Sequence, residues 1–319
     1  MTDEKDISRE LLDLIEQYDN DTKRILKEHS RLDYLYALAD MRENLLEWYP
    51  FRPEGRLLEV GSGYGAMTGL YSRKVAEVVV LDPARDNLAV NRMRHQEMEN
   101  ITYVEESLVS YAARTARKTS AAGEVGASKA VESLDGTDVS GAVESVGGTD
   151  ISGTVDAADE ENRQKFFDYI VFVGTLTEDA REQIAAAKSL LKKDGELIAA
   201  ACNPFGIKYW AGAKKDDVSF SKKELIRLLT ECGGEPDMPD ENDRLEFYYP
   251  MPDYRLPISV YSQSFLPGKG DLTNTLTAYD YPQYLLLDVG AAYDAVCEDG
   301  QFENFANSFL VIWRNHGTD

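Results

Sequence analysis

The residues best suited to bind a ligand stand in one short stretch, LLEVGSGYGAMTG, residues 57–69. Three glycines, Gly61, Gly63 and Gly65, follow a run typical of a buried strand and precede a helical pattern. Glycine weakens regular structure, so a cluster at such a junction indicates that something comes very close to the backbone. The start of the following helix adds free N–H groups. The sequence therefore predicts a ligand-binding turn between strand and helix.

Two classes of ligand fit this turn. A dinucleotide needs G-x-G-x-x-G/A, which Gly61, Gly63 and Ala66 satisfy. S-adenosylmethionine sites place an acidic residue before G-x-G-x-G, and Glu59 with the three glycines satisfies that pattern in full. A carboxylate inside an apolar strand needs a partner. A cationic group of the ligand would serve, and a salt bridge to an Arg or Lys is the alternative.

Asp82 adds a second acidic position. It ends the next apolar strand, 21 residues after Gly61. A carboxylate there can accept hydrogen bonds from the ribose hydroxyls of either cofactor class. The alternative role is that of a turn residue before Pro83.

The composition narrows the classes of partner that the protein is expected to bind. The 319 residues carry a formal charge of −23, which disfavours binding to nucleic acid or anionic membrane surfaces. The three cysteines and three histidines are scattered, so we predict no metal site and no disulfide framework. The charged N-terminus lacks an apolar signal core, and no 18-residue apolar run predicts a membrane span. We expect a cytoplasmic protein.

The sequence predicts an α/β fold whose alternation of strands and helices is interrupted by two insertions. Residues 1–50 have apolar residues at helical spacing and predict an N-terminal helical segment. Residues 51–319 then alternate strands with helices, which predicts a Rossmann-like, seven-stranded, mostly parallel sheet with helices on both faces. Residues 112–165 are poor in aromatic residues and repeat GTDVSGAV as GTDISGTV, which predicts a disordered insertion. Residues 250–304, rich in proline and aromatics, predict an ordered insertion or lid before the last strand.

The expected elements have the following bounds. Strands are predicted at 56–60, 78–81, 101–104, 169–173, 196–201, 245–249 and 307–313, and helices at 66–74, 85–97, 179–191 and 221–231, with a turn at 192–195. Ser221 and Glu224 form a capping-box pattern at the start of the last helix.

Several motifs, in this order and spacing, resemble the class I S-adenosylmethionine-dependent methyltransferases. They are LLEVGSGYG, VVLDP, NITYVEES, FDYIVFVGTL and LLKKDGELIAA. More narrowly, MRENLLEWYPF, NPFGIKYWAGA, FYYPMPDYRLPISVYS and FANSFLVIW resemble a bacterial subgroup often encoded with glycosyltransferases of surface polysaccharide synthesis. The resemblance implies an enzyme that methylates an acceptor, with a hydroxyl of a sugar or polysaccharide precursor as the expected site and a glycosyltransferase as a potential partner.

The resemblance also assigns site residues. The implied S-adenosylmethionine contacts are Glu59, Gly61, Ser62, Gly63, Gly65, Asp82, Pro83, Ser107, Leu108, Val173 and Gly174. Ser107 has a helix cap as its alternative role. The expected acceptor contacts, beside the carboxyl ends of the strands, are Asn203, Lys208, Tyr209, Asp253 and Tyr254. No residue stands out in the sequence as a catalytic base.

Two other functions remain open at this point. A chain that kept the fold could serve as a non-catalytic partner of a glycosyltransferase. The glycine pattern also fits an NAD-dependent oxidoreductase, although such folds usually continue with a second βαβ half. The expected antiparallel strands at the sheet edge favour the methyl donor.

Overall fold

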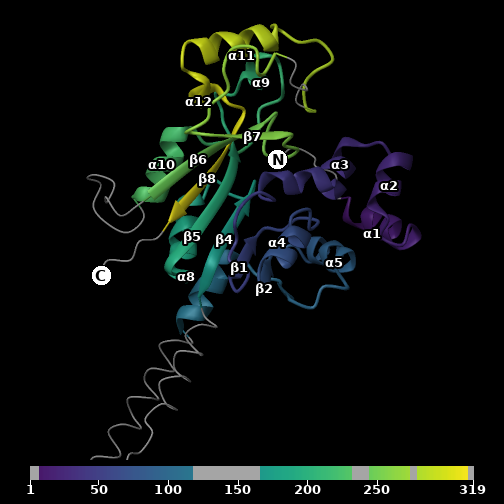
Figure 1. The fold of residues 1–319 in the computed structure, drawn as a ribbon. Helices are drawn as coiled ribbons and strands as arrows, with labels where there is room; N and C mark the ends of the chain where they lie inside the picture. The colour runs from purple at the N-terminus through teal and green to yellow at the C-terminus, as the bar shows by residue number, and fades with distance from the viewer. Residues whose placement is uncertain (1–6, 118–165, 232–243, 274–278, 315–319) are drawn as a thin grey trace, which may run out of the picture.

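The computed structural model describes residues 7–117, 166–231, 244–273 and 279–314. Figure 1 shows one twisted sheet with helices packed on both of its faces. The sheet has eight strands in the order β3-β2-β1-β4-β5-β8-β6-β7. In chain order they are β1 (Arg56–Val60), β2 (Glu77–Leu81), β3 (Ile101–Val104), β4 (Phe167–Val173), β5 (Leu191–Cys202), β6 (Arg244–Met251), β7 (Ser259–Ser262) and β8 (Ser308–Arg314).

The first five strands are parallel and form one side of the sheet, from β3 at its edge to β5. β1 lies between β2 and β4, in a register that places Glu59 beside Val80 and Val171. Most residues of β4 are buried, since helices cover both faces. All five strands therefore end at the same edge, and the loops that follow them meet there.

The last three strands are antiparallel. β8 pairs with β5 on one side and β6 on the other, and β7 extends the edge through β6. The predicted count of seven strands was therefore wrong by one. The extra strand, β7, lies inside the segment 250–304, where the prolines of the sequence hid a run of only four residues.

Two groups of helices sandwich the sheet. On one face, buried residues of α8 and α10 join the core of the strands, and on the other face those of η1, α4 and α5 do so. The bounds are α4 (Thr68–Lys74), α5 (Arg85–Arg94), α8 (Ala180–Leu190), α9 (Ile207–Trp210), α10 (Lys222–Thr230), α11 (Val289–Glu298) and α12 (Phe302–Phe305). The predicted capping box is confirmed, because Ser221 and Glu224 cap α10 reciprocally. Among the described residues no helix is long and apolar enough to cross a membrane.

The N-terminal helices form a smaller layer beside α5. They are α1 (Ser8–Gln17), α2 (Thr22–Glu28), α3 (Leu32–Leu38) and the 3-10 helix η1 (Asp40–Leu45). Leu11, Ile15 and Leu38 pack with Val90 of α5 in a separate apolar cluster. This contact brings the N-terminal helices over the loops that follow the parallel strands (Figure 1).

Some predicted boundaries moved. α4 begins two residues after its expected start, because the glycine turn extends to Met67, and α5 ends three residues before residue 97. The expected turn at 192–195 lies within β5, where a register shift and the positive φ of Asp194 interrupt the pairing. Residues 108–117 are helical, so the prediction of disorder is wrong for residues 112–117, and residues 118–165 lie outside the described part of the chain. The second half of the predicted insertion 250–304 contains α11 and the start of α12.

Candidate functional site

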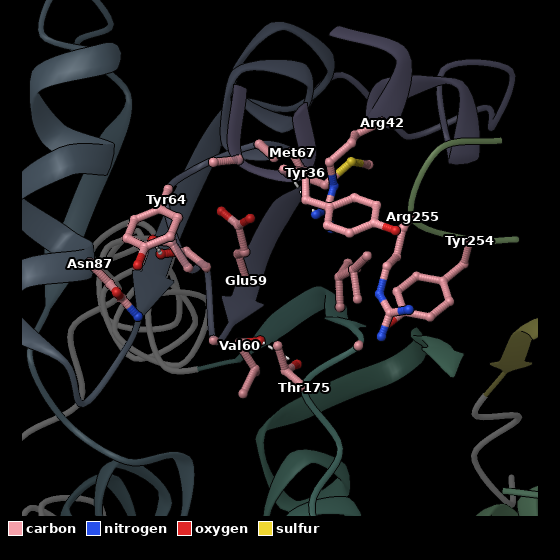
Figure 2. A pocket seen from close by; sticks show the side chains of 18 of the residues that line it. Tyr36, Arg42, Glu59, Val60, Tyr64, Met67, Asn87, Thr175, Tyr254 and Arg255 are labelled. Carbon is pink, nitrogen blue, oxygen red and sulfur yellow. Dashed lines mark hydrogen bonds between the residues drawn. The ribbon is translucent and has the colours of Figure 1, made fainter. Parts of the chain in front are cut away.

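A cavity of about 610 Å³ opens where β1 and β4 end (Figure 2). Its floor is the predicted glycine turn, with Gly61, Ser62 and Gly63 at its surface. Gly61 has a φ of 70° and Gly63 a φ of 51°, the left-handed region that favours glycine. A Cβ at Gly63 would meet no atom within 4 Å, so the open cavity lies directly above that residue.

Glu59 is a buried carboxyl at the base of this cavity. The residue is 5% exposed, and Thr68 Oγ1 donates a hydrogen bond of 2.6 Å to its Oε2. The described residues give it no ion pair within 4 Å, so the salt bridge considered as an alternative is absent there. Burial raises the pKa of Glu59 to about 8, because the hydrogen bond from Thr68 and the charges of Arg42 and Arg94 offset the lost hydration only in part.

Arg42 faces Glu59 from the opposite wall. It comes from η1, and Figure 2 shows its side chain reaching down toward the cavity. Its Nη1 donates to the backbone oxygen of Tyr36 at 2.9 Å, while its buried Nε has no hydrogen-bond partner. Burial lowers the pKa of Arg42 from its ordinary value. The cavity therefore presents one acid and one base that do not pair with each other.

Helix α5 supports the glycine turn from below. A Cβ at Gly65 would lie 2.5 Å from the side chain of Asn91, which donates to Thr68 Oγ1 at 2.8 Å. His95 Nε2 lies 2.9 Å from the Gly65 carbonyl oxygen. Burial lowers the pKa of His95 to about 4, which keeps the ring neutral. These contacts fix the turn through neutral side chains.

The predicted cofactor residues divide into two groups. Glu59, Gly61, Ser62, Gly63, Val173 and Gly174 all line the cavity. The remaining predicted residues, Gly65, Asp82, Pro83, Ser107 and Leu108, do not line it.

Each residue outside the cavity has another position. Asp82 is buried and accepts hydrogen bonds from the backbone amides of Gly63 at 3.0 Å and Ala84 at 2.8 Å. It holds the turn from below, while Asn87 reaches the cavity beside it (Figure 2). Ser107 accepts from the Ser110 amide at the start of the helix 108–117, which is the capping role. Leu108 is a core residue.

A second cavity of about 480 Å³ adjoins the first. The two share the lining residues Tyr36, Gly174, Tyr254 and Arg255. Figure 2 shows Tyr36, Tyr254 and Arg255 together on one side of the first cavity. The second cavity lies at the ends of β4 and β5 and is bordered by the loop 214–220.

A charge cluster stands behind the second cavity. Lys208 is fully buried, and its Nζ lies 2.9 Å from Asp280 Oδ2, 3.4 Å from Asp253 Oδ2 and 3.5 Å from Asp216 Oδ2. Arg255 pairs with the other oxygen of Asp216. Although burial acts to lower it, the surrounding groups, Cys202 and the three carboxylates, raise the pKa of Lys208 above its ordinary range.

Of the five predicted acceptor residues, Tyr254 alone lines the second cavity. Lys208 and Asp253 lie in the charge cluster, and the Tyr209 hydroxyl donates to Asp216. Asn203 is buried and donates to the backbone oxygens of Asn304 at 2.9 Å and Ala306 at 2.7 Å, which ties β5 to the turn before β8.

Several residues that line the two cavities were not predicted from the sequence. Tyr36 and Arg42 come from the N-terminal helices, and Asp216, Arg255 and Asp280 from segments without a recognised motif. Asp280 is isolated among aromatic and apolar residues in TAYDYPQY, which is a weak signal of a buried charge. Asp216 stands in the charged run KKDD and Arg42 directly precedes Glu43, so the sequence gives no such signal for them.

Comparison with known proteins gives likeness of fold only. No family model matches the chain, and no curated protein sequence is significantly similar to it. Among solved structures, a methyltransferase from Archaeoglobus fulgidus is 12% identical with a TM-score of 0.43, over 88% of this chain and 94% of that one. One from Thermotoga maritima is 15% identical with a TM-score of 0.43, over 96% and 100%.

A third similar structure contains a bound ligand. The N-methyltransferase NodS from Bradyrhizobium japonicum, solved with S-adenosyl-L-homocysteine, is 13% identical with a TM-score of 0.39, over 94% of this chain and 90% of that one. Likeness at this level does not decide the activity or the acceptor of this protein.

Proposed function

We propose that this protein is an S-adenosylmethionine-dependent methyltransferase. The observation that carries the proposal is the unpaired Glu59 and Arg42 on facing walls of the cavity above the glycine turn. The amino-acid end of S-adenosylmethionine has one ammonium and one carboxylate. Glu59 would hold the ammonium and Arg42 the carboxylate, each gaining the counter-charge that it lacks.

The same pair disfavours a dinucleotide. NAD has no amino-acid zwitterion, and its pyrophosphate would bring negative charge toward the buried Glu59. The strand order supports the proposal as well, because antiparallel β8 follows β5 where nicotinamide folds continue with parallel strands. A glycine-rich turn with a free space above Gly63 suits either ligand, so the charges decide between them.

The remaining contacts follow from this placement. We propose that Gly61, Ser62 and Gly63 lie against the ribose and methionine portions of the cofactor, with Val173 and Gly174 beneath it. On the resemblance alone, we also propose contacts with the ribose and adenine of the cofactor. These contacts would come from Asp82, Pro83, Ser107 and Leu108. The cofactor supplies an activated methyl group, and this chain positions it for in-line displacement.

The acceptor that we propose is a hydroxyl of a sugar or polysaccharide precursor. The support for it is the resemblance of residues 41–51, 203–213, 247–262 and 305–313 to the polysaccharide-associated subgroup. The same resemblance supports a glycosyltransferase as a partner. We further propose a cytoplasmic location, which suits the free thiols of Cys202 and Cys297.

Calorimetric titration with S-adenosylmethionine, S-adenosylhomocysteine and NAD tests the proposal. We expect micromolar binding of the first two and none of NAD. Gly63→Arg should abolish this binding, because its side chain would fill the cavity. Asp82→Ala should weaken it, because the Gly63 amide loses its acceptor. Binding of NAD alone, or retained binding in both variants, would overturn the proposal.

A further inference from the structure

The second cavity is placed to hold the group that receives the methyl. It shares Tyr36, Gly174, Tyr254 and Arg255 with the cofactor cavity, so the two are neighbours across a thin wall. Gly174 keeps this wall thin. Its φ is 73°, and a Cβ there would lie 2.3 Å from the Tyr254 hydroxyl.

A hydroxyl or an amine must lose a proton when it is methylated, and a nearby group has to take it. Several titratable groups around the second cavity are unsuited to this. Burial raises the pKa of the Cys202 thiol and of the Tyr254 phenol to about 12, so both stay protonated. Burial also raises the pKa of Tyr36.

Two of the nearby carboxylates are fully engaged. Asp216 accepts from Arg255 through one oxygen and from Tyr209 through the other. Burial acts to raise its pKa, but Arg255 and Lys208 outweigh burial and hold that pKa well below its ordinary value. Asp253 accepts from the Arg255 amide at 2.9 Å and from Lys208, and it does not line the cavity.

Asp280 differs from both. It lines the second cavity, and Lys208 Nζ donates to its Oδ2 at 2.9 Å. Its Oδ1 is enclosed yet accepts no hydrogen bond from the described residues. An enclosed carboxylate oxygen without a donor costs free energy, and a ligand that supplies a donor would remove that cost. Lys208 fixes the carboxylate in this position from behind.

We propose that the second cavity binds an acceptor with a hydroxyl or amine nucleophile, and that Asp280 accepts its proton. The inference rests on the proposed methyltransferase function. As the methyl carbon bonds to the nucleophile, the nucleophile's O–H or N–H bond breaks and its proton passes to Asp280 Oδ1. The sulfur–methyl bond breaks with its electron pair left on sulfur. Asp280 is thus the catalytic base that the sequence did not reveal.

Cofactor analogues that carry a side arm in place of the methyl group test the role of Asp280 without knowledge of the natural acceptor. In these probes a nitrogen replaces the sulfur of S-adenosylhomocysteine and carries a 2-aminoethyl or 3-aminopropyl arm, with an n-propyl arm as the uncharged control. The arm leaves the cofactor where the methyl would stand. The proteins compared by calorimetry are wild type, Asp280→Asn, Asp280→Glu and Asp13→Asn, which changes an exposed carboxylate on α1.

The better amino-armed analogue should bind wild type about tenfold or more tightly than the propyl analogue, the effect of one charged hydrogen bond. Asp280→Asn should lose this preference, while Asp280→Glu and Asp13→Asn should retain it. S-adenosylhomocysteine should bind all four equally, which reports that each variant is folded. If Asp280→Asn fails that control, Asp280→Ser replaces it.

Two other results separate the claims. If S-adenosylhomocysteine binds but the amino arms give no gain, or the gain survives in Asp280→Asn, the role of Asp280 is wrong while the proposed function stands. If neither S-adenosylhomocysteine nor any analogue binds wild type, the proposed function fails and this inference fails with it.

Discussion

The two neighbouring cavities hold their buried charges in opposite ways. In the cofactor cavity, Glu59 and Arg42 stand apart, each without an ion pair in the described part of the chain. At the wall of the second cavity, Lys208 and Arg255 form ion pairs with Asp216, Asp253 and Asp280 in one cluster. Among the described residues, the first cavity leaves Glu59 and Arg42 without an ion pair, whereas beside the second cavity the five residues of the cluster neutralise one another.

This difference separates two uses of buried charge. An unpaired buried charge costs stability, and its cost is recovered when a ligand of opposite charge binds. A paired cluster recovers most of its cost internally and holds nearby side chains in fixed positions. Removing a charge should therefore lower ligand affinity in the first cavity and lower stability in the second.

The largest effect is expected at Lys208. Lys208→Met should lower the free energy of unfolding by about 3–5 kcal/mol, because three carboxylates lose the cation between them. Urea unfolding measures this. Lys23→Met, at a side chain that is 83% exposed, is the control and should change stability by less than about 0.5 kcal/mol. A loss below about 1 kcal/mol at Lys208 would contradict the internal pairing.

Arg42→Met should act on binding instead. The affinity for S-adenosylhomocysteine should fall roughly 30- to 100-fold, which corresponds to about 2–3 kcal/mol from lost charged hydrogen bonds. The unfolding free energy should stay the same or rise, because an unpaired buried charge is removed. Calorimetry and urea unfolding of the same sample give both values, and Arg9→Met changes an exposed arginine as the control. Unchanged affinity would show that Arg42 does not contact the ligand.

The raised pKa of Glu59 predicts that ligand binding is coupled to the release of a proton. Its pKa is about 8 in the ligand-free protein against an ordinary value of 4.5, so the folded state keeps a proton that the unfolded chain has lost between these pH values. Its contribution to stability is thus present below pH 4.5 and is lost as the pH rises toward 8. A bound ammonium favours the carboxylate, so binding at pH 7 should release about one proton.

Titration of S-adenosylhomocysteine in phosphate and Tris buffers measures that release, because the two buffers differ in their heat of ionisation. The affinity should rise from pH 6 to pH 8. Glu59→Gln should remove the proton release and weaken binding by about tenfold, while Glu182→Gln, on the exposed face of α8, should change neither. Equal heats in both buffers with the wild type would contradict a cationic ligand group at Glu59.

The smallest effect concerns the support below the glycine turn. The pKa of His95 is lowered to about 4 from 6.5 by burial, so the unfolded chain binds a proton first as the pH falls. Stability should therefore fall between pH 6.5 and 4, and this residue should account for roughly 1–2 kcal/mol of the loss. Thermal unfolding of the wild type and His95→Gln across this range measures it. The same pH dependence in both would show that His95 does not contribute.

The two cavities also differ in how far the sequence could predict them. Glu59, Gly61 and Gly63 lie within five residues, so strand, turn and ligand contact appear as one local pattern. The parallel strands were equally plain, as continuous apolar runs near their observed positions. Only tertiary packing brings Arg42 to this cavity, and no spacing rule connects it to β1.

The second cavity could not be assembled in this way. The charge cluster at its wall draws residues from α9, the loop after it, and the segment between β6 and β8, with Lys208 and Asp280 separated by 72 residues. Lys208, Tyr209 and Asp253 were predicted near the acceptor, yet all three lie one layer behind the cavity wall. A sequence shows that a charge is present but not which neighbour will neutralise it.

The central claim is that the cofactor cavity recognises an amino-acid zwitterion through Glu59 and Arg42. Its most direct test is the affinity of S-adenosylhomocysteine against that of 5′-methylthioadenosine, which has the same nucleoside and thioether but no amino acid. We predict that S-adenosylhomocysteine binds about 100-fold or more tightly, and that this preference is lost in Arg42→Met. Equal affinity for the two compounds in the wild type would contradict the account.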